Sequence, residues 1–555
     1  MARNARSLLC LFLVVVMLVG CTPTNGPAAE PEKTLAEMSL DERLTYYTNL
    51  GSSPDDNYRT WYEIFLYSFC DSNGDGIGDF QGAISKLDYL KELGVNGIWL
   101  MPIHPSTSYH KYNVDDYYAI DPAYGTMADF DQFMAECEKR DIHVIMDLVV
   151  NHCGSNNPWF KEARDYLKTL DVGDFGDPAQ CKYFDYFNFN IEGGKGYSRV
   201  PGTWGYYYEC QFSGDMPDLN WDSELMKADV KNVMQFWLDK GVAGFRVDAA
   251  KEFYTGAVTK NVEVMKWLQQ TAESIKPDVY MVAEVWETNY TVIEAYYESG
   301  FTSIFNYPFG NSTGKLMQVV NGRGNPNMVK TWATAQETAH KAYAKSHPEY
   351  IDAPFLSNHD ILRIFDGVSG DPLRVKMAGA MNLFMGGSAF IYYGEEIGMA
   401  TTGNTDSDPS KRAPMYWNAE RNEGTTLPCP GCTLPTEYPN GSLKEQQADE
   451  GSVYNYYRQA VAIRNALPVI ARGVPTAEAA LNTGCVSALR KTWNDQQCII
   501  LMNVDDDEAG VQVDLTAYAD WDLAAMLSAN GQPITLEDTT LTMPAYGIAI
   551  LVPKA

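Results

Sequence analysis

The sequence of 555 residues is poor in basic side chains, since 42 Lys and Arg stand against 72 Asp and Glu, for a formal charge of −30. A surface this acidic repels phosphate and argues against a nucleic-acid partner. After the N-terminus, no apolar run reaches the length of a membrane span, and the folded part contains no internal repeat or low-complexity tract. Apolar residues make up 45% and charged residues 21%, proportions that exclude a disordered or fibrous chain.

The sequence also lacks cysteines and histidines at the spacing that a zinc site requires. Among eleven cysteines, only Cys429 and Cys432 form a close pair, with no second such pair and no histidines beside it. A local disulfide in a surface loop is the interpretation we favour for this pair. Cys485 and Cys498 could face each other across a hairpin, although spacing alone does not fix disulfide connectivity.

Aromatic side chains, by contrast, are abundant, with 12 Trp, 35 Tyr and 22 Phe. Their rings are rigid contact surfaces with an apolar face, and those of Tyr and Trp also carry a polar edge. Such surfaces suit a ligand with apolar faces and hydroxyl edges, such as a sugar.

The N-terminus has the pattern of a targeting segment. Arg3 and Arg6 precede an apolar run, Leu8–Val19, and the segment ends with Gly20-Cys21. This ending resembles a bacterial lipobox, which implies a signal peptide over residues 1–20, cleavage before Cys21 and lipid on its sulfur; the alternative is an ordinary signal peptide that contains a cysteine. We expect residues 21–56 to form a lipidated tether, and the protein to lie on the extracellular face of the cell envelope, anchored to a membrane or secreted.

Short apolar runs alternate with amphipathic stretches through most of the chain. Eight runs are predicted as strands: Ile64–Phe69, Gly97–Leu100, His143–Val150, Gly244–Val247, Tyr280–Val285, Ser303–Tyr307, Pro354–Ser357 and Ala389–Tyr393. The stretches between them have helical periodicity, as in Phe80–Leu93, Met127–Arg140 and Leu225–Lys240. Strand–helix alternation repeated eight times predicts an α/β fold, a parallel (β/α)8 TIM barrel.

Two regions depart from the strand–helix alternation. The interval after the third strand is too long for one loop, so residues 152–215 are predicted as a small inserted domain. A final barrel helix is expected over Glu445–Ala466, followed by short strand-like runs over 484–491, 497–502, 510–515 and 547–552. The prediction is therefore a barrel over 57–151 and 216–469, with a C-terminal antiparallel β-sandwich over 470–555.

Ionisable residues end four of the predicted strands. Asp248, Glu284 and Asp360 follow the fourth, fifth and seventh strands, and Arg246 shares a face with Asp248. In a barrel of this type, chemistry takes place at the C-terminal ends of the strands. Any one of these acids alone would be interpreted as a salt bridge or a loop cap, but four coincident strand-end clusters predict a common site.

Paired carboxylates at a cleft are the requirement of glycoside hydrolysis, in which one acid attacks the anomeric carbon and the other protonates the leaving oxygen. We expect Arg246 to keep Asp248 ionised by favouring its charged form. We expect neighbouring carboxylates and apolar walls to raise the pKa of Glu284, as a general acid needs.

The motifs around these acids resemble the conserved regions of the alpha-amylase family, glycoside hydrolase family 13. The four regions correspond to Asp147–His152, Gly244–Lys251, Glu284–Trp286 and Phe355–Asp360, with further matches at Gly94–Pro102, Gly394–Gly398 and Met216–Asn220. The resemblance covers about residues 60 to 470, and a C-terminal β-sandwich also fits the architecture of the family.

The resemblance implies a role for each matching residue. Asp248 would be the nucleophile and Glu284 the acid and base, while Asp360 would bind sugar hydroxyls and favour the distorted ring. Tyr112 would be a stacking platform, and Lys111 stands before it where many members have glycine. Substrate contacts are expected from these residues: Tyr112, Asp116, His152, Arg246, Lys251, His359 and Arg363.

A calcium loop is predicted near the first strand. Asp71, Asn73, Asp75 and Asp79 place side-chain oxygens at positions 1, 3, 5 and 9, Gly76 stands at the turn position 6, and Ile77 can offer its carbonyl at position 7. Position 12 is Gly82, so the loop is not a complete EF-hand, and the alternative is an acidic surface turn. We expect Ca2+ as the cofactor, and a second calcium near Asn151 is a weaker possibility.

The residues favour an endo-acting, retaining alpha-amylase on starch and maltooligosaccharides, present as a monomer. Ala249-Ala250-Lys251 after the nucleophile resembles members that cleave α-1,4 bonds, whereas Met216–Asn220 and the calcium loop resemble oligo-1,6-glucosidases. The alternatives are an α-glucosidase, oligo-1,6-glucosidase or neopullulanase-like hydrolase, a transglycosylase and, least favoured, a non-catalytic glucan-binding lipoprotein. Lys411–Met415 with Trp417 could wall the leaving-group side or be an ordinary loop.

Overall fold

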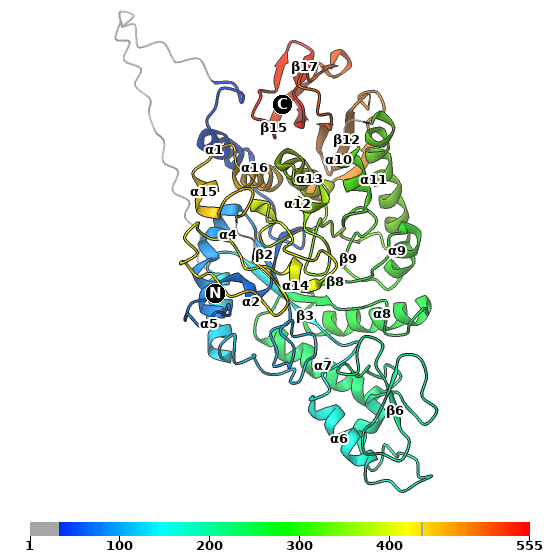
Figure 1. Ribbon diagram of the computed structural model, residues 1–555. Helices are drawn as coiled ribbons and strands as arrows, with labels where there is room; N and C mark the ends of the chain where they lie inside the picture. Colours follow the sequence, from blue (N-terminus) through cyan, green and yellow to red (C-terminus); the bar gives the residue numbers. More distant parts are fainter. Residues whose placement is uncertain (1–32, 323–324, 435–436, 483, 555) are drawn as a thin grey trace, which may run out of the picture.

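The structure is a computed structural model that describes residues 33–322, 325–434, 437–482 and 484–554 (Figure 1). The predicted signal peptide, residues 1–20, and the predicted lipid-bearing Cys21 lie outside the described residues. Within the described part, no helix combines the length and apolarity that crossing a membrane requires.

The centre of the molecule is a parallel sheet of seven strands that curves into a barrel. In spatial order these are β10 (Ala389–Tyr392), β1 (Thr60–Ile64), β2 (Gly97–Leu100), β3 (His143–Leu148), β7 (Gly244–Val247), β8 (Tyr280–Ala283) and β9 (Ser303–Ile304). The segment around Ala353 joins the two edges. The amide of Asn306 donates to Ala353 O at 3.0 Å, and the amide of Phe390 donates to Pro354 O at 2.9 Å. The predicted (β/α)8 barrel is thereby confirmed.

Two of the predicted strands differ from the structure. The first strand is Thr60–Ile64 rather than Ile64–Phe69, and Leu66–Phe69 forms the short helix α2. Because Glu63 is charged, the strand does not form a continuous apolar run and is not predicted from the sequence, although Glu63 is buried. The seventh run, Pro354–Ser357, contributes one isolated bridge, between Phe305 and Ala353. Pro354 has no N–H to donate, which limits regular pairing at this position.

Helices surround the barrel on its outside (Figure 1). The predicted helix Phe80–Leu93 divides at Lys86, and the predicted final helix divides because Ser452 caps a new start. The helices of the barrel layer include α3 (Phe80–Ser85), α4 (Leu87–Leu93), α5 (Met127–Glu138), α7 (Glu224–Asp239), α8 (Val258–Ile275), α9 (Tyr290–Tyr297), α10 (Lys315–Asn321), α11 (Pro326–Ser346), α12 (Ile364–Gly367), α13 (Pro372–Met385), α15 (Leu443–Gln447), α16 (Val453–Ala466) and α17 (Pro468–Arg472).

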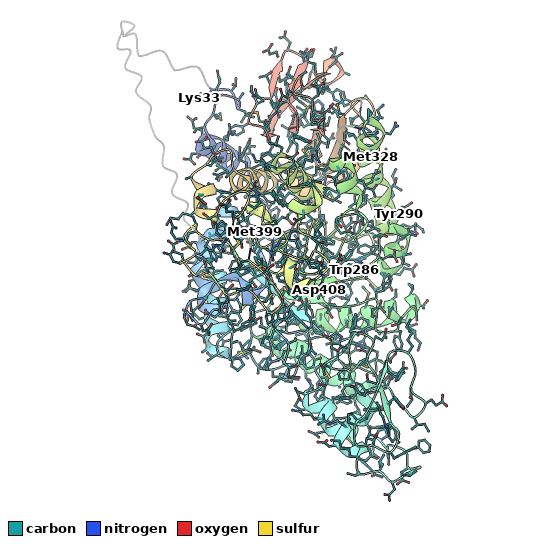
Figure 2. The ribbon with its side chains drawn as sticks, viewed as in Figure 1. Lys33, Trp286, Tyr290, Met328, Met399 and Asp408 are labelled. Atoms are coloured by element: carbon teal, nitrogen blue, oxygen red, sulfur yellow. The ribbon has the colours of Figure 1, made fainter. Side chains whose placement is uncertain are left out.

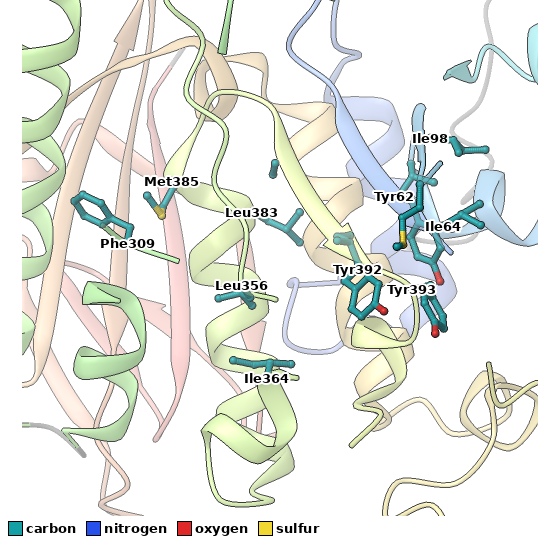
Figure 3. Close-up of a cluster of buried hydrophobic side chains, with 14 of the residues drawn as sticks. Tyr62, Ile64, Ile98, Phe309, Leu356, Ile364, Leu383, Met385, Tyr392 and Tyr393 are labelled. Carbon is teal, nitrogen blue, oxygen red and sulfur yellow. The ribbon is translucent and has the colours of Figure 1, made fainter. Parts of the chain in front are cut away.

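Aromatic rings fill the interior of the barrel. Trp61 stacks on Tyr280 with ring centroids 5.1 Å apart and on Phe390 at 6.1 Å. Gly97 on the neighbouring strand makes room for Trp61, because a Cβ at position 97 would lie 2.2 Å from the indole ring. On the other face of the sheet, aliphatic and tyrosine side chains pack against the helices (Figure 3). The barrel is therefore a packed core that holds the strand ends in fixed positions.

The region inserted after β3 extends away from the barrel (Figure 1). It contains α6 (Pro158–Leu167), the short helix η1 (Lys182–Tyr186) and an antiparallel sheet of β4 (Phe189–Asn190), β6 (Tyr207–Glu209) and β5 (Tyr197–Arg199). A β-bridge between His152 and Asp218 joins the start of the insertion to its end. The insertion therefore leaves the barrel and returns beside the same strand end.

The C-terminal region consists of antiparallel strands, as predicted. One sheet has the order β11 (Val474–Ala477), β12 (Val486–Trp493), β13 (Gln496–Asn503), β18 (Gly547–Pro553) and β15 (Trp521–Ser528). The other has the order β14 (Val511–Asp514), β17 (Thr540–Met543) and β16 (Thr535–Glu537). The strands β11, β15, β16 and β17 were not among the four predicted runs.

The predicted tether of residues 21–56 is too long. Helix α1 (Leu40–Leu50) begins with a capping box between Ser39 and Glu42. Tyr47 is fully buried, and its hydroxyl donates to Met526 O at 3.1 Å. Arg43 Nε donates to Gln459 Oε1 at 3.0 Å. Residues 40–50 therefore belong to the folded body and link α16 to the C-terminal sheets.

The cysteine predictions are also corrected. All nine cysteines of the described part are free thiols. Cys429 and Cys432 are buried rather than exposed in a surface loop: Cys429 Sγ donates to Pro409 O and Arg412 O, and Cys432 Sγ lies 3.2 Å from Thr402 Oγ1. Cys498 lies opposite Lys491, whereas the amide of Val504 donates to Cys485 O, so Cys485 and Cys498 do not face each other.

Candidate active site

The three predicted acids lie around one cavity of about 520 Å³. Asp248 directly follows β7, Glu284 directly follows β8, and Asp360 follows the segment that closes the barrel. The amide of Asp248 donates to Leu148 O and the amide of Glu284 donates to Val247 O, so strand pairing fixes both acids at the same end of the sheet. We call this space the catalytic cavity.

Arg246 on β7 is completely buried and connects the acids. Its Nη1 donates to Asp248 Oδ1 and to Asp147 Oδ1, each at 2.6 Å, and its Nη2 lies 3.0 Å from Glu284 Oε1. A guanidinium presents several donors in a rigid plane, which allows it to bind several carboxylates at once. Because one guanidinium reaches both Asp248 and Glu284, the two acids are held near each other, as a retaining double displacement requires.

Glu284 has the environment of a general acid. Burial raises the pKa of its carboxyl, the charge of Arg246 opposes the rise, and the carboxylates of Asp248 and Asp360 add to it. Tyr307 OH donates to Glu284 Oε1 at 3.2 Å. These surroundings favour the protonated form that a leaving oxygen needs.

For Asp248, Arg246 favours the charged form as expected, but it does not set the net direction of the pKa shift. Burial raises the pKa of Asp248, and the ion pair with Arg246 opposes that rise. The reason is that the carboxyl is only 7% exposed, so loss of hydration outweighs the nearby positive charge. Both acids are thus buried, and Arg246 offsets part of the cost for each.

The residue after Asp248 has unusual backbone geometry. Ala249 has φ 47°, in the left-handed region that residues with a side chain rarely adopt. In this conformation its amide donates to Glu284 Oε2 at 3.0 Å. A strained residue therefore connects the Asp248 strand to the second acid.

Asp360 is held by positive groups from two elements. His359 Nε2 lies 3.1 Å from Asp360 Oδ2, and Arg412 Nη2 lies 2.6 Å from Asp360 Oδ1. Burial would raise the pKa of Asp360, but His359 and Arg412 hold it well below its ordinary value. Asp360 is therefore ionised and can accept hydrogen bonds from sugar hydroxyls.

His359 lies between two carboxylates. Its Nδ1 is 2.6 Å from Glu63 Oε1 on β1, and its Nε2 faces Asp360. Burial alone would lower the pKa of His359, but Asp360 and Glu63 raise it to about 10. The imidazole is therefore a cation at neutral pH, and both ring nitrogens donate.

Tyr112 is fixed by the same network. Its ring stacks on His359 with centroids 5.4 Å apart, and its hydroxyl lies 2.7 Å from His359 Nε2 and donates to Asp147 Oδ2 at 3.2 Å. Trp99 Nε1 also donates to Asp147 Oδ2, at 3.1 Å. Tyr112 lines the catalytic cavity, which is the position expected of a stacking platform.

Lys111 occupies a backbone conformation that favours glycine, with φ 65°. Its ammonium lies 2.6 Å from Asp121 Oδ2, and both side chains are 9% exposed. This buried ion pair holds the loop in place although the residue has a side chain. The loop therefore presents Tyr112 to the cavity with lysine at the position before it.

His152 and the inserted region form the opposite wall. His152 lines the cavity, and its Nε2 is buried without a hydrogen-bond partner among the described residues. Burial lowers the pKa of His152 to about 4, so the ring is neutral at pH 7. Phe212 packs against His152 at 5.4 Å, and Met216 from the returning segment completes this wall.

Five predicted substrate contacts lie outside the walls of the cavity: Arg246 and His359, which are fully buried beside the acids, and Asp116, Arg363 and Lys251. Asp116 is exposed and accepts from the amide of Tyr118 at 2.8 Å, which makes it a turn residue. Arg363 is 1% exposed and donates to the carbonyls of Lys411 and Tyr393, so it positions the wall rather than facing sugar. Lys251 donates to Trp286 O at 3.0 Å, and its contact with substrate stays a prediction.

Several residues of the site were not predicted. Glu63 could have been found as a lone charge inside an otherwise apolar strand. Arg412 was named only within the possible wall Lys411–Met415, and the structure gives that stretch an ion pair with Asp360. Trp286 and Asp408 also line the cavity, and Figure 2 labels them close together near the centre of the molecule. Trp286 lies in a loop and Asp408 begins the short helix α14 (Asp408–Lys411), and neither belongs to a periodic pattern.

The predicted calcium loop forms one tight turn. Asp71 Oδ2 accepts from Gly76 N at 2.8 Å, and Asp75 Oδ1 accepts from Ile77 N at 2.8 Å. Asp79 caps α3, where its Oδ1 accepts from Gly82 N at 2.7 Å. The donors are all oxygens, which fits a hard cation, although no group of three or more His, Cys, Asp or Glu gathers as a metal cluster in the described ranges.

Comparison with known proteins gives concordant results. The family model "Alpha amylase, catalytic domain" matches residues 63–473. Alpha-amylase 3 of Dictyoglomus thermophilum is 37% identical over 428 residues, covering 76% of this chain and 80% of that protein. The solved structure of Eubacterium rectale Amy13B has a TM-score of 0.87 and 40% identity, covering 92% of this chain and 98% of its own. An oligo-1,6-glucosidase of Parageobacillus thermoglucosidasius is 29% identical over 526 residues, covering 80% and 89%.

Proposed function

The chain belongs to the alpha-amylase family of glycoside hydrolases, and we propose that it is a retaining, endo-acting alpha-amylase that hydrolyses α-1,4 bonds of starch and maltooligosaccharides. The observation that carries the proposal is the single guanidinium of Arg246 bound to both Asp248 and Glu284 beside Asp360. A double displacement requires two neighbouring acids in one cavity.

In the first step, an oxygen of Asp248 attacks the anomeric carbon while Glu284 gives its proton to the glycosidic oxygen. The bond to the leaving sugar breaks, and a covalent ester forms on Asp248. In the second step, Glu284 takes a proton from water, and the resulting hydroxide displaces the ester oxygen. Two inversions at one carbon retain the α configuration.

Asp360 and His359 act on the sugar held between the two acids. As the ring acquires positive charge, the hydroxyls that it donates to Asp360 become more acidic, and their hydrogen bonds strengthen. Arg412 and the protonated His359 keep the Asp360 carboxylate in one orientation. Tyr112, backed by the stacked ring of His359, offers a flat surface for the apolar face of the same sugar ring.

Preference for α-1,4 bonds is supported by two observations. Ala249 directly follows the nucleophile and lines the cavity, so only a methyl group stands where a bulkier side chain would restrict the chain beyond the cleaved bond. The relative from Dictyoglomus thermophilum is named an alpha-amylase. Phe212 and Trp286, 53% and 47% exposed, provide rings on two walls for further sugar residues.

An oligo-1,6-glucosidase is the second candidate. A relative with this name matches over 89% of its length, and the segment Met216–Asn220 resembles that branch. A transglycosylase would use the same ester intermediate and pass the sugar to another sugar in place of water. These candidates differ in acceptor and linkage, not in the roles of the three acids.

Ca2+ is proposed as a structural cofactor. Asp71, Asn73 and Asp75 would supply side-chain oxygens and Ile77 its carbonyl, while Asp79 would act through water, as position 9 of such loops often does. A bound cation would brace the turn ahead of α3. Chelation should lower the melting temperature by several degrees, and Asp75→Ala should abolish that difference; an unchanged melting curve after verified removal of metal would contradict the proposal.

We also propose that lipid on Cys21 anchors a monomeric enzyme at the extracellular face of the cell envelope. Metabolic labelling with a fatty acid in the native host, compared between the wild type and Cys21→Ser, tests the anchor. Retained label in the variant would contradict it.

Product analysis tests the main proposal. Amylose, maltotriose, isomaltose and pullulan are incubated with the full chain, and products are separated by size while NMR records their anomeric form. A series of α-anomeric maltooligosaccharides from amylose supports an endo-acting alpha-amylase. Glucose released from isomaltose, with amylose untouched, would overturn the α-1,4 assignment, and β-anomeric products would overturn the retaining mechanism.

A further inference from the structure

Tyr307 lies beside the acid Glu284, on the neighbouring strand of the barrel. It comes two residues after Phe305, whose amide donates to Ala283 O at 3.1 Å, so Tyr307 follows the end of β9 as Glu284 follows the end of β8. The hydroxyl of Tyr307 donates to Glu284 Oε1 at 3.2 Å. Strand pairing therefore brings a tyrosine into direct contact with the acid.

The ring of Tyr307 is held on two sides. Trp286 stacks on it with ring centroids 5.2 Å apart, and Phe355 meets it edge-on at 4.9 Å. Asn311 Nδ2 donates to Tyr307 O at 3.1 Å, which holds the backbone as well. Tyr307 is fully buried, whereas Trp286 is half-exposed and lines the catalytic cavity. Because Tyr307 is not exposed, it does not touch a bound sugar, and its effect on catalysis has to pass through Glu284.

The two oxygens of the Glu284 carboxyl have different surroundings. Oε1 accepts from Tyr307 OH and lies 3.0 Å from Arg246 Nη2, while Oε2 accepts from the amide of Ala249 at 3.0 Å. A carboxylate oxygen has about two lone-pair positions, and a proton on Oε1 would compete with both donors there. Oε2 faces a single donor among the described residues, so the position left for the proton is on Oε2.

The hydroxyl of Tyr307 stays a donor at every working pH. Burial and the neighbouring Glu284 raise the pKa of Tyr307 well above its ordinary value, so the phenol keeps its proton. Burial also raises the pKa of Glu284, but a hydrogen bond donated to its carboxylate favours the ionised form. A general acid works best with a pKa near the operating pH. Tyr307 therefore limits how weak an acid Glu284 becomes.

We propose that Tyr307 is a positioning residue for Glu284: its hydroxyl holds Oε1 in place, so that Oε2 carries the proton to the leaving oxygen. The inference rests on the proposed function only in taking Glu284 as the general acid, and it does not depend on which α-glucosidic bond is cleaved. Without the hydroxyl, the carboxyl keeps its contacts with Arg246 and Ala249 but loses the one that fixes Oε1 from the side of β9. Proton donation then slows, although the sugar still binds.

Tyr307→Phe removes only the hydroxyl, and kcat/KM is measured across pH on the oligosaccharide cleaved fastest in the product analysis. Loss of a donor to the carboxylate should move the basic limb of the profile upward by about 0.5–1 pH unit. At the optimum, kcat should fall about tenfold. KM should change by less than about twofold, because Tyr307 makes no contact in the cavity.

Tyr456→Phe on α16 is the matched control. Tyr456 is also buried, and its hydroxyl has no hydrogen-bond partner among the described residues. Its pH profile, kcat and KM should match those of the wild type, and all variants should melt at a similar temperature. A pH profile of Tyr307→Phe identical to that of the wild type would overturn the proposal.

An activated substrate separates positioning of the acid from a general loss of structure. A nitrophenyl α-glycoside of the same sugar has a leaving group that needs little protonation, so its kcat/KM should be nearly the same in Tyr307→Phe and the wild type. Equal losses on both substrates would overturn the proposal. Glu284→Gln is measured alongside. Full turnover by that variant would refute Glu284 as the acid, whereas an inactive Glu284→Gln beside an unaffected Tyr307→Phe would refute only the role of Tyr307.

Discussion

The two ends of the barrel bury polar groups in opposite ways. At the catalytic cavity the buried groups are charged and nearly all are paired: Arg246 binds Asp147, Asp248 and Glu284, while His359 lies between Glu63 and Asp360. At the start of the strands, the amide of Gln336 and the hydroxyl of Tyr343 are buried without partners among the described residues, and the buried carboxyl of Asp352 accepts from the neutral amide of Asn306.

The difference shows what the burial of paired charges achieves. Burying charges beside one another shifts pKa values: that of Glu284, the proposed acid, is raised, and that of Asp360, the proposed hydroxyl-binding carboxylate, is lowered. Chemistry is therefore expected at the end of the barrel that carries the paired charges.

The difference between the two ends of the barrel is tested most strongly by replacing Asp248, the proposed nucleophile, and Glu284, the proposed acid. Asp248→Asn keeps the size of the side chain but cannot form the ester, and Glu284→Gln cannot give a proton. Each should lower kcat on maltotriose by at least about a thousandfold, because the two residues act as one unit. Initial rates by reducing-end assay measure the loss.

Asp165→Asn on α6 is the control for this pair, because it makes the same chemical change on an exposed helix. Its rate should match that of the wild type, and all variants should melt within a few degrees of it. Substantial turnover by Asp248→Asn would remove the distinction between the two ends of the barrel.

The stability of the charged end should depend on pH through His359. Its folded pKa of about 10 lies above its ordinary value, so the stabilisation is fully present below about pH 6.5 and is lost as pH rises through 10. We expect the free energy of unfolding to fall by about 2–4 kcal/mol between pH 7 and 10.5. Urea denaturation across this range measures the fall.

Glu63→Gln sharpens the same test, because it removes one of the two carboxylates that raise the pKa of His359. The fall in stability should shrink and begin at lower pH. Glu349→Gln, an exposed glutamate, is the control that reports general charge effects. Identical pH profiles for Glu63→Gln and the wild type would be incompatible with the paired cation.

The meeting of the acids at one end of the barrel could be predicted from the sequence. Asp248 and Glu284 follow apolar strands directly, and parallel strands carry their C-terminal ends to one edge, so their meeting could be inferred from strand order. The residues that pair with His359 and Asp360 were harder to predict. Glu63 lies within a strand and meets His359 only because the barrel closes, and Arg412 reaches Asp360 from a loop without periodicity.

The buried, unpaired side chains of Gln336 and Tyr343 left no signal in the sequence. Gln336 and Tyr343 occupy ordinary positions on an amphipathic helix, where the pattern predicts burial against the barrel. Whether a buried glutamine finds a partner depends on the backbone of distant segments such as Gly386 and Arg472. Tertiary packing determines whether the glutamine has a partner, and local sequence patterns carry no information about it.

Lys111 offers a test of how strain and pairing combine beside Tyr112. Lys111→Ala leaves Asp121 buried without its partner and keeps φ near 65°, so unfolding should become about 3–5 kcal/mol easier. Lys111→Gly loses the same pairing but relieves the backbone, and it should be less destabilised by about 1 kcal/mol. Denaturant titration of both variants measures the difference, and KM should rise in both. A glycine variant no more stable than the alanine variant would mean that the left-handed backbone carries no strain.

The smallest effect is expected from Asp352→Asn, ahead of the segment that closes the barrel. Burial raises the pKa of Asp352 to about 6, so the folded state binds this proton more tightly than the unfolded chain, and stability falls as pH rises from about 4 to about 6. At pH 8 the charged carboxyl is a cost that asparagine removes, and its new amide can donate to the unpaired Asn306 Oδ1. We expect a gain of about 1 kcal/mol at pH 8 and less at pH 5, by urea denaturation. A loss at pH 8 would show that the charge of Asp352 is stabilised by pairing, and the contrast between the two ends would then fail, because both would bury charges for the same reason.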